Sequence, residues 1–418
     1  MSKKIDLIIT NAVINDTEEL VNFYVVSGKI DTIKIATETN LNNSELEEAN
    51  QIYDAGGNFL CSGFYESHIH LDKACILDRC KIEEGTLEEA VEETGKAKKE
   101  FTEEDVFTRA SRVVEMAIKK GTMGLRTFVE TDPKTELRSF EAIKKVREHY
   151  AFAIDIEICA FAQEGLTQEM ETHDLLKKAL QNGADLVGGC PYKDEDPGKH
   201  IEMIFDLAEE FDVNVDFHLD FDLDPDNSSI PKIAEETEKR AYQGRASIGH
   251  VTKLSAMPKE QREKMAMLLS NANIALTVLP ATDIFLNGRD HDVLIPRGMV
   301  NANQLAENGI TTTISSNNIL NAFTPYGDAS LLRMANMYAN IAQLSKDKEI
   351  AEVYKMITTN AARLLSMQSD INEGAPANFV ILETKNAIDA IRTIAQPLAG
   401  FKNGKQTFSN EKAEIYFK

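Results

Sequence analysis

The sequence has few cysteines, no CxxC pair and no long apolar run. Its five cysteines are an odd number, which disfavours a disulfide framework and favours a reducing compartment. No stretch of 18 apolar residues occurs, and the first residues lack the apolar segment of an export signal. These absences predict a cytoplasmic protein that is neither exported nor membrane-spanning.

Positive charge is also scarce. The sequence has 45 Lys and Arg residues and 68 Asp and Glu residues, which gives a formal net charge of −23 and a pI near 4.8. Nucleic-acid binding needs clustered basic side chains against the phosphates, so this composition disfavours it. A length of 418 residues with 43% hydrophobic residues is sufficient for one large domain with a small companion.

Two histidines, His68 and His70, stand two residues apart just after the apolar segment 59–63. Side chains alternate between the two faces of a strand, so both imidazoles are expected on one face. Two imidazoles at the end of a buried strand can coordinate a metal ion. The alternative is a pair of strand-end histidines that holds no metal.

The central part of the chain alternates strand-like and helix-like segments. Such alternation is typical of a parallel sheet covered by helices. Eight strand-like segments predict an α/β protein with a (β/α)8 TIM barrel. They begin near residues 59, 124, 152, 186, 213, 246, 274 and 311.

The two ends of the chain are rich in short β-like runs instead. Residues 5–9, 23–26 and 30–35 lie near the start, while residues 377–382 and part of 407–417 lie near the end. Neither set is large enough to fold alone. We therefore expect a small β-sandwich built from both termini, residues 1–58 plus 369–418, with the barrel formed by residues 59–368.

Polar residues gather where the predicted barrel strands end, which is where barrel enzymes carry their chemistry. These residues are His68, His70, His218, His250, Asn317 and Asn318. The other histidines are expected elsewhere: His149, His173 and His200 on solvated helix or loop positions, and His291 in a polar loop that could face a substrate.

The order His68-x-His70, His218, His250 and then position 317 resembles the amidohydrolase superfamily. Further segments are similar to its cytosine deaminase branch, and the likeness extends over nearly the whole chain. These segments are residues 160–165, 183–189, 286–289, 323–327, 358–365 and 373–377. Lys73, after His70-Leu71-Asp72, is more similar to the N-isopropylammelide amidohydrolases of that branch than to true cytosine deaminases.

The resemblance implies one divalent metal ion, Zn or Fe, held by His68, His70 and His218. Such an ion lowers the pKa of water enough for attack on a ring carbon at neutral pH. His250 would then steady the reacting oxygen.

For the substrate, the resemblance implies a small nitrogen heterocycle. Gln163 would hydrogen-bond an amide-like edge of the ring, and Lys73 would add charge or pair with Asp72. Because many relatives assemble, it also points to a homo-oligomer.

Two positions depart from the family pattern. Asn317 stands where the family has an Asp that binds metal and takes a proton; an amide oxygen can still be a ligand but cannot be a base. Phe221 stands where cytosine deaminases have an acid–base Glu. Asp220 is the expected substitute, because on a continuing strand it shares the face of His218.

The sequence thus predicts a metal-dependent hydrolase of C–N bonds on a heterocycle such as an aminopyrimidine, pterin or triazine. Two alternatives stay open. Asn317 and Phe221 favour a degenerate barrel that binds a heterocycle without turnover. The second alternative is ring-opening hydrolysis of a lactam-like ring, which would release no ammonia.

Overall fold

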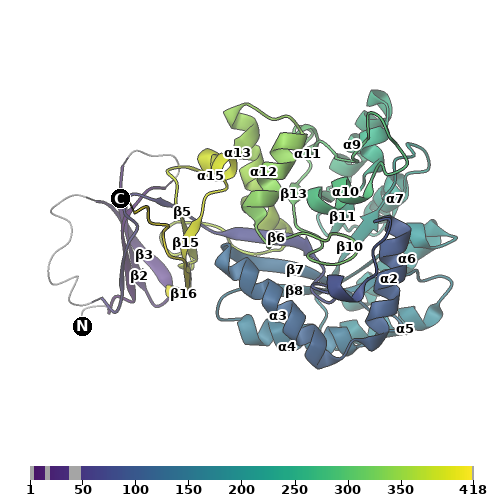
Figure 1. The fold of residues 1–418 in the computed structure, drawn as a ribbon, viewed down its shortest axis with the longest axis horizontal. Helices are drawn as coiled ribbons and strands as arrows, with labels where there is room; N and C mark the ends of the chain where they lie inside the picture. The colour runs from purple at the N-terminus through teal and green to yellow at the C-terminus, as the bar shows by residue number, and fades with distance from the viewer. Residues whose placement is uncertain (1–3, 15–18, 37–48, 417–418) are drawn as a thin grey trace.

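Eight parallel strands form the central sheet of the molecule. The computed structural model describes residues 4–14, 19–36 and 49–416, and in it these strands pair in sequence order from β6 to β13 (Figure 1). Their hydrophobic residues are almost all buried, as expected for strands covered by helices. The strands are β6 (Phe64–Ile69), β7 (Thr122–Glu130), β8 (Asp155–Ala162), β9 (Leu186–Gly189), β10 (Asn214–Leu219), β11 (Ala246–His250), β12 (Ala275–Val278) and β13 (Thr312–Ile314).

The first and last strands of this sheet meet through Asn317. Its backbone N–H donates to the carbonyl of His68 (3.0 Å), and its carbonyl accepts from the N–H of His70 (2.9 Å). Below this seam, the Ser67 hydroxyl lies 2.7 Å from that of Ser315. The sheet therefore closes, and the predicted (β/α)8 barrel is confirmed.

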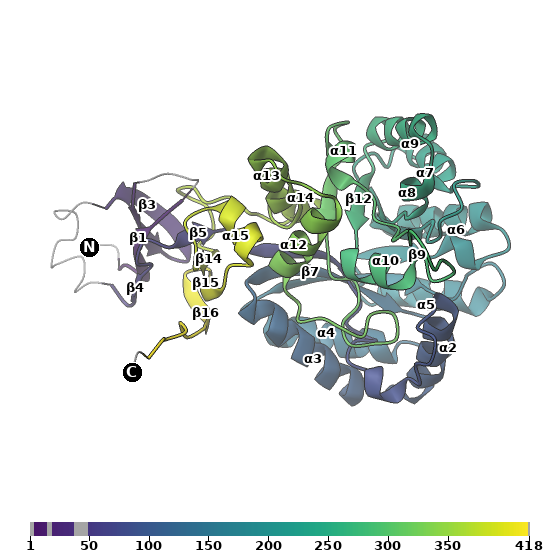
Figure 2. The ribbon, with the colours of Figure 1, turned by 45° about the horizontal axis from the view of Figure 1, so that its top comes forward.

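Amphipathic helices cover the barrel (Figure 2). In α3, Thr102 caps the first turn by accepting from the N–H of Asp105, and residues three or four apart, such as Val106, Ala110 and Val113, face the sheet. The helices are α2 (Leu87–Ala97), α3 (Glu103–Lys119), α4 (Arg138–Tyr150), α5 (Met170–Gln181), α6 (Pro197–Phe211), α7 (Ile230–Lys239), α8 (Lys253–Ala256), α9 (Lys259–Asn271), α10 (Pro280–Leu286), α11 (Ala302–Ala306), α12 (Leu331–Ile341), α13 (Asp347–Met356), α14 (Thr359–Leu364) and α15 (Ala387–Thr393). Short 3-10 helices are η1 (Leu77–Arg79), η2 (Lys98–Glu100) and η3 (Pro191–Lys193). None of the helices within the described ranges is both long and apolar enough to cross a membrane.

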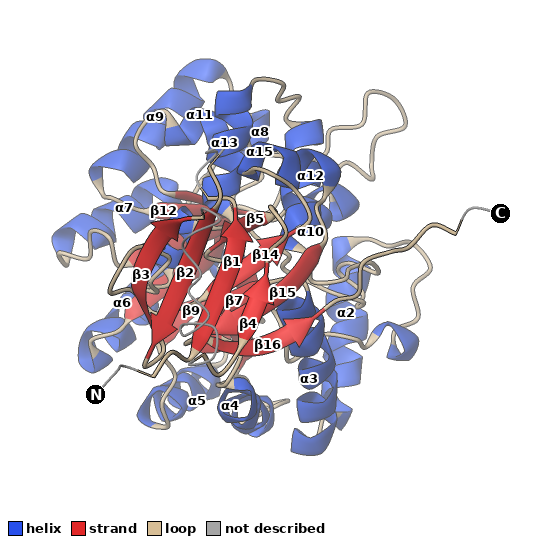
Figure 3. Ribbon diagram, turned by 90° about the vertical axis from the view of Figure 1, so that its left-hand side faces the viewer, coloured by secondary structure: helices blue, strands red, loops and turns tan. Residues whose placement is uncertain are grey.

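The chain ends form the predicted β-sandwich (Figure 3). One sheet has the order β3-β2-β1-β4 and the other β16-β15-β14-β5, so each end of the chain contributes strands. Apolar residues from both ends, including Phe23 and Phe379, whose ring centroids lie 5.4 Å apart, fill the space between the sheets. The strands are β1 (Leu7–Ala12), β2 (Val21–Val26), β3 (Lys29–Ile35), β4 (Ile52–Asp54), β5 (Phe59–Cys61), β14 (Phe379–Leu382), β15 (Pro397–Lys402) and β16 (Lys405–Ser409).

The strand expected to begin near residue 59 is divided in two. Gly63 has a φ of +80°, and a Cβ atom there would lie 2.5 Å from Met123, so the chain turns at this glycine. As a result β5 pairs with β14 in the sandwich, and only β6 enters the barrel. We therefore propose a domain boundary after residue 61; of the expected 1–58 segment, residues 1–3, 15–18 and 37–48 lie outside the described ranges.

Candidate functional site

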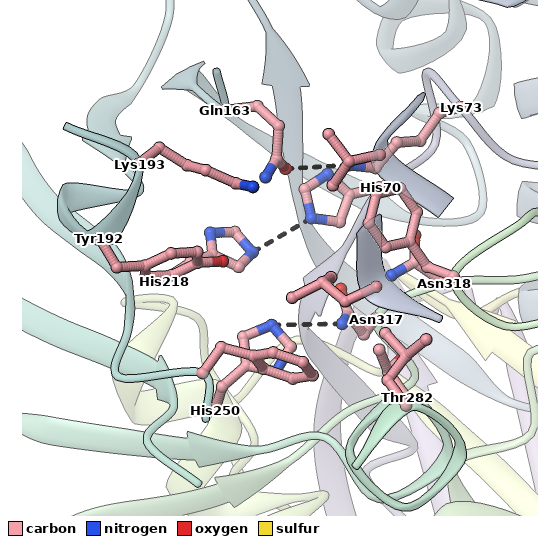
Figure 4. A pocket seen from close by; sticks show the side chains of 15 residues that line it. His70, Lys73, Gln163, Tyr192, Lys193, His218, His250, Thr282, Asn317 and Asn318 are labelled. Atoms are coloured by element: carbon pink, nitrogen blue, oxygen red, sulfur yellow. Dashed lines mark hydrogen bonds between the residues drawn. The ribbon is translucent and has the colours of Figure 1, made fainter. Parts of the chain in front are cut away.

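A polar pocket opens at the carboxyl ends of the barrel strands (Figure 4). His70, from the end of β6, and His218, from β10, point toward each other, and His250 and Asn317 form a second pair beside them. Closure of the barrel brings these residues together although they are up to 247 positions apart in the sequence.

Three imidazoles converge on one point at the base of this pocket. The Nε2 atom of His218 lies 2.7 Å from Nε2 of His68 and 3.1 Å from Nε2 of His70. A neutral imidazole nitrogen carries either one hydrogen or one in-plane lone pair, so hydrogen bonding accounts for one of these approaches and not for both. Two ligands of a tetrahedral ion with metal–nitrogen bonds of about 2.0–2.1 Å would lie about 3.3 Å apart, which is close to this arrangement.

The protonation state of the three histidines also suits a metal. Burial lowers the pKa of His68, His70 and His218 well below the usual value, and neighbouring positive groups lower it further. Neutral imidazole is the form that binds metal ions. The three Nδ1 atoms are buried and have no hydrogen-bond partner in the described part of the chain.

His250 is held by a carboxylate on its far side. Its Nδ1 atom lies 2.7 Å from Oδ1 of Asp283, a fully buried residue at the start of α10. The Nδ1 hydrogen therefore points to Asp283, and Nε2 is left as an acceptor facing the pocket. The amide nitrogen of Asn317 lies 3.4 Å from this Nε2 atom.

This contact fixes the amide orientation of Asn317. Since His250 Nε2 accepts, the Nδ2 group of Asn317 faces it, and the amide oxygen points elsewhere. That oxygen is buried and unpaired among the described residues. An unpaired amide oxygen beside three neutral imidazoles fits a metal centre as a further ligand.

The surrounding backbone holds these side chains in place. Gly249 of β11 faces His68, and a Cβ atom at this position would lie only 2.8 Å from the imidazole Cε1 atom. Glu66 accepts from the N–H of Ser316 through both carboxylate oxygens (3.0 and 3.1 Å), which holds the segment that carries Asn317. Burial raises the pKa of Glu66 to about 7.

The two residues expected to bind substrate, Lys73 and Gln163, contact each other. The Lys73 ammonium group donates to Oε1 of Gln163 (3.0 Å) and to Glu130 (2.6 Å). The expected ion pair with Asp72 is not formed; the Asp72 carboxylate instead accepts from the backbone N–H groups of Lys73 and Glu130. Lys73 and Gln163 both line the pocket.

A cluster of acidic residues lies behind Lys73. Glu130, Asp132 and Glu164 lie close enough together to hold a cation. The Lys98 ammonium group already occupies their centre, 2.8 Å from Glu130 and 2.5 Å from Asp132 and in contact with Glu164. Lys98 is only 1% exposed, and sequence reasoning missed it because a lysine beside other lysines on a polar helix resembles a surface residue.

The expectation that Asp220 shares the face of His218 is wrong. Strand β10 ends at Leu219, and Asp220 adopts a φ of +52°, so its side chain leaves the strand pattern. Its carboxylate accepts from Ser228 (2.5 Å) and from the N–H of Ser229 (3.0 Å) and does not line the pocket. Phe221 lines the pocket instead.

His200 also differs from its expected place. It is fully buried rather than solvated, and its Nδ1 atom contacts the carboxylate of Asp194. His149 is exposed and His173 half-buried, as expected, while His291 lies on an exposed loop beside a neighbouring hollow. The pocket also contains Tyr192, Lys193 and Thr282, which no motif in the sequence indicated, and Phe323, which begins one of the family-like segments.

Comparison with known proteins agrees with this fold and site. Residues 162–408 match the model of the amidohydrolase family. N-isopropylammelide isopropyl amidohydrolase of Pseudomonas sp. strain ADP is 28% identical over 421 residues, covering 98% of this chain and 99% of that protein. A pterin deaminase of Rhizobium rhizogenes is 24% identical over 77% of this chain and 74% of its own length. The crystal structure of 5-methylcytosine deaminase from Klebsiella pneumoniae with 5-fluorocytosine superposes with a TM-score of 0.92 at 27% identity, covering 98% and 99% of the two chains.

The fold and the three-histidine centre define a barrel hydrolase. The family match covers more than half of the chain, and the resemblance to the cytosine deaminase-like branch is confirmed. The chain therefore belongs to the amidohydrolase family, enzymes that hydrolyse C–N bonds other than peptide bonds.

Proposed function

We propose that this protein hydrolyses the bond between a ring carbon and an exocyclic nitrogen on a small nitrogen heterocycle. The observation that carries the proposal is the convergence of three neutral imidazoles at the base of the pocket. The activities named for the similar proteins, on N-isopropylammelide, pterin and 5-methylcytosine, support a heterocyclic substrate.

His68, His70 and His218 would hold one divalent ion, Zn or Fe, with the amide oxygen of Asn317 as a further ligand. When bound, such an ion lowers the pKa of water and polarises the ring carbon's substituents. The unpaired Asn317 oxygen and the low pKa of the imidazoles support this set of ligands.

His250 is the acid–base group that the pocket offers. Its Nε2 atom faces the pocket and can receive a proton from the attacking water, while Asp283 orients the ring and stabilises the imidazolium that forms. The same nitrogen can then return the proton to the departing amine. Gln163 and Lys73 would fix the ring in the orientation that exposes its reacting carbon.

Asn317 limits the rate in this scheme. An amide cannot take a proton, so Asn317 cannot assist His250 as a carboxylate would. Loss of a positioned base commonly lowers the rate by about 10² to 10⁴. We therefore expect slow turnover in the natural chain.

The test is Asn317→Asp in the full-length protein. Amine and ammonia release from aminopyrimidines, pterins and triazines should rise at least tenfold over the natural chain, with the bound metal measured by emission spectrometry in both proteins. Asn318→Asp is the matched control, because it adds the same charge to the pocket without facing His250. A metal-loaded Asn317→Asp protein that releases no amine from any of these compounds would contradict the proposal.

A second function, binding a heterocycle without turnover, is favoured by Asn317 and Phe221. Both lie in the pocket where the family pattern has carboxylates. Under this function the natural chain would bind heterocycles, and the Asn317→Asp protein would gain no activity.

A further inference from the structure

The walls of the pocket carry an unpaired positive charge. Lys73 and Lys193 are among its 15 lining residues, which include no carboxylate. Glu130 neutralises Lys73 at 2.6 Å, whereas no carboxylate within the described ranges pairs with Lys193. Figure 4 shows the side chain of Lys193, the last residue of η3, extending toward Gln163 from the side opposite Lys73.

The amides of the pocket present donors rather than acceptors. Gln163 accepts from Lys73 through its oxygen, and its Nε2 group donates one hydrogen to Cys190 Sγ (3.3 Å) and has a second hydrogen to donate. Asn318 accepts from Asn321 through its oxygen (2.8 Å), which leaves its amide nitrogen to donate. The exception is the Asn317 oxygen, which belongs to the candidate metal centre.

Apolar side chains complete the pocket. Phe221 and Phe323 provide aromatic surfaces, and Leu87 and Val91 of α2 cover the donors. Lys193 is half-buried beside these walls, so a charge–charge contact with it is stronger there than on an open surface. A planar ring between these walls would therefore find hydrogen-bond donors and a positive charge at its edge.

We propose that the pocket selects an anionic, oxo-substituted heterocycle and that Lys193 pairs with the negative edge of its ring. A neutral, amino-rich ring would place N–H groups against the donors of Gln163 and Asn318, and the positive charge of Lys193 would stay unpaired. This inference rests on the proposed function for the identity of the site but concerns recognition alone.

The test compares barbiturate, which is ionised at neutral pH, with uracil, a neutral ring of nearly the same shape. Binding to the full-length protein is measured by isothermal titration calorimetry at fixed ionic strength. We expect barbiturate to bind at least tenfold more tightly than uracil. Lys193→Met should weaken barbiturate binding at least tenfold and change uracil binding less than threefold, because hydrogen bonds to charged groups are the stronger ones.

Lys199→Met is the matched control, since Lys199 lies on the exposed side of α6 and its ammonium group is 3.6 Å from Glu202. It should leave the affinity for both rings unchanged. Equal affinity for the two rings, no binding of either, or equal barbiturate binding by the natural and Lys193→Met proteins would each overturn the inference. Lys193-dependent barbiturate binding without amine release by Asn317→Asp would overturn the proposed hydrolysis alone.

Discussion

Two residues set the charge of the pocket. Asn317 removes the negative charge of the family's carboxylate, and Lys193 adds a positive charge. Asn317 occupies a position fixed by the family pattern, so its missing carboxylate could be recognised from the sequence. Lys193 lies in η3, directly after β9, in a segment without a motif, and only the pairing of the barrel strands places it beside Gln163.

Other single residues show why partners are harder to predict than positions. The alternation rule placed His68 and His70 on one face of β6, because a strand has a simple period. Lys98 and Asp283 are buried beside partners more than 30 residues away in the sequence, and no local pattern separates such residues from solvated ones. Asp220 leaves the face of His218 because β10 ends one residue earlier, at Leu219, and a hydrophobic pattern does not mark the end of a strand to a single residue.

Glu130 gives a prediction about acid stability. Burial opposes its ionisation, but Lys73 and Lys98 lower its pKa to about 2. The ordinary value is 4.5, so folding favours the carboxylate: this stabilisation is complete above pH 4.5 and is lost as the pH falls toward 2. Glu130→Gln should lower the free energy of unfolding at pH 7 by about 3–5 kcal/mol, because a buried ion pair is broken.

Urea unfolding followed by circular dichroism tests this prediction. The difference between the natural and Glu130→Gln proteins should shrink below pH 4.5 by about 1.4 kcal/mol per pH unit. Glu83→Gln, which removes an exposed ion pair with Lys81, should cost less than about 0.5 kcal/mol at any pH. A Glu130 effect that is the same at pH 7 and pH 3.5 would contradict the assignment.

At the scale of the element, β11 shapes the candidate metal centre without contributing a metal ligand. Gly249 lies against the His68 ring and leaves no room for a methyl group. This requirement could not be predicted, because the sequence shows a glycine before His250 but not the ring on the opposite strand.

Gly249→Ala should therefore displace the His68 imidazole. We expect at least a tenfold loss of zinc affinity, measured by competition with a chromogenic chelator, while circular dichroism shows a folded protein. Gly95→Ala is the control: this glycine lies inside α2 with no atom closer than 3.7 Å to the added Cβ, so alanine should stabilise the helix by about 0.5–1 kcal/mol. Equal zinc affinity in the two variants would refute the packing argument.

For the molecule as a whole, the βα alternation was enough to predict the barrel, because each strand and helix leaves a periodic pattern in the sequence. The composite sandwich was predictable since both ends carry β-rich runs too small to fold alone. The exact division was not, because it depends on the turn at Gly63 and on the pairing of β5 with β14, which joins segments more than 300 residues apart.

The sandwich gives a prediction at this scale. Removing residues 369–418 would take away β14, β15 and β16 and expose Leu7, Ile9 and Phe23, which pack against apolar residues of these strands. We expect that truncated chain to aggregate on expression. Removing only the part after residue 410, which is exposed where described, should leave the thermal midpoint unchanged within about 2 °C. A soluble, monodisperse chain ending at residue 368 in size-exclusion chromatography would show that the barrel folds without the sandwich.

The seam at Asn317 has an evolutionary consequence. The hydrogen bonds that close the barrel there come from the backbone of Asn317, between the carbonyl of His68 and the N–H of His70. Asn and Asp both tolerate the φ of +60° found at this position. A lineage can therefore exchange carboxylate for amide, or restore it, without rebuilding the barrel, so the two forms of this site stand one substitution apart on the same backbone.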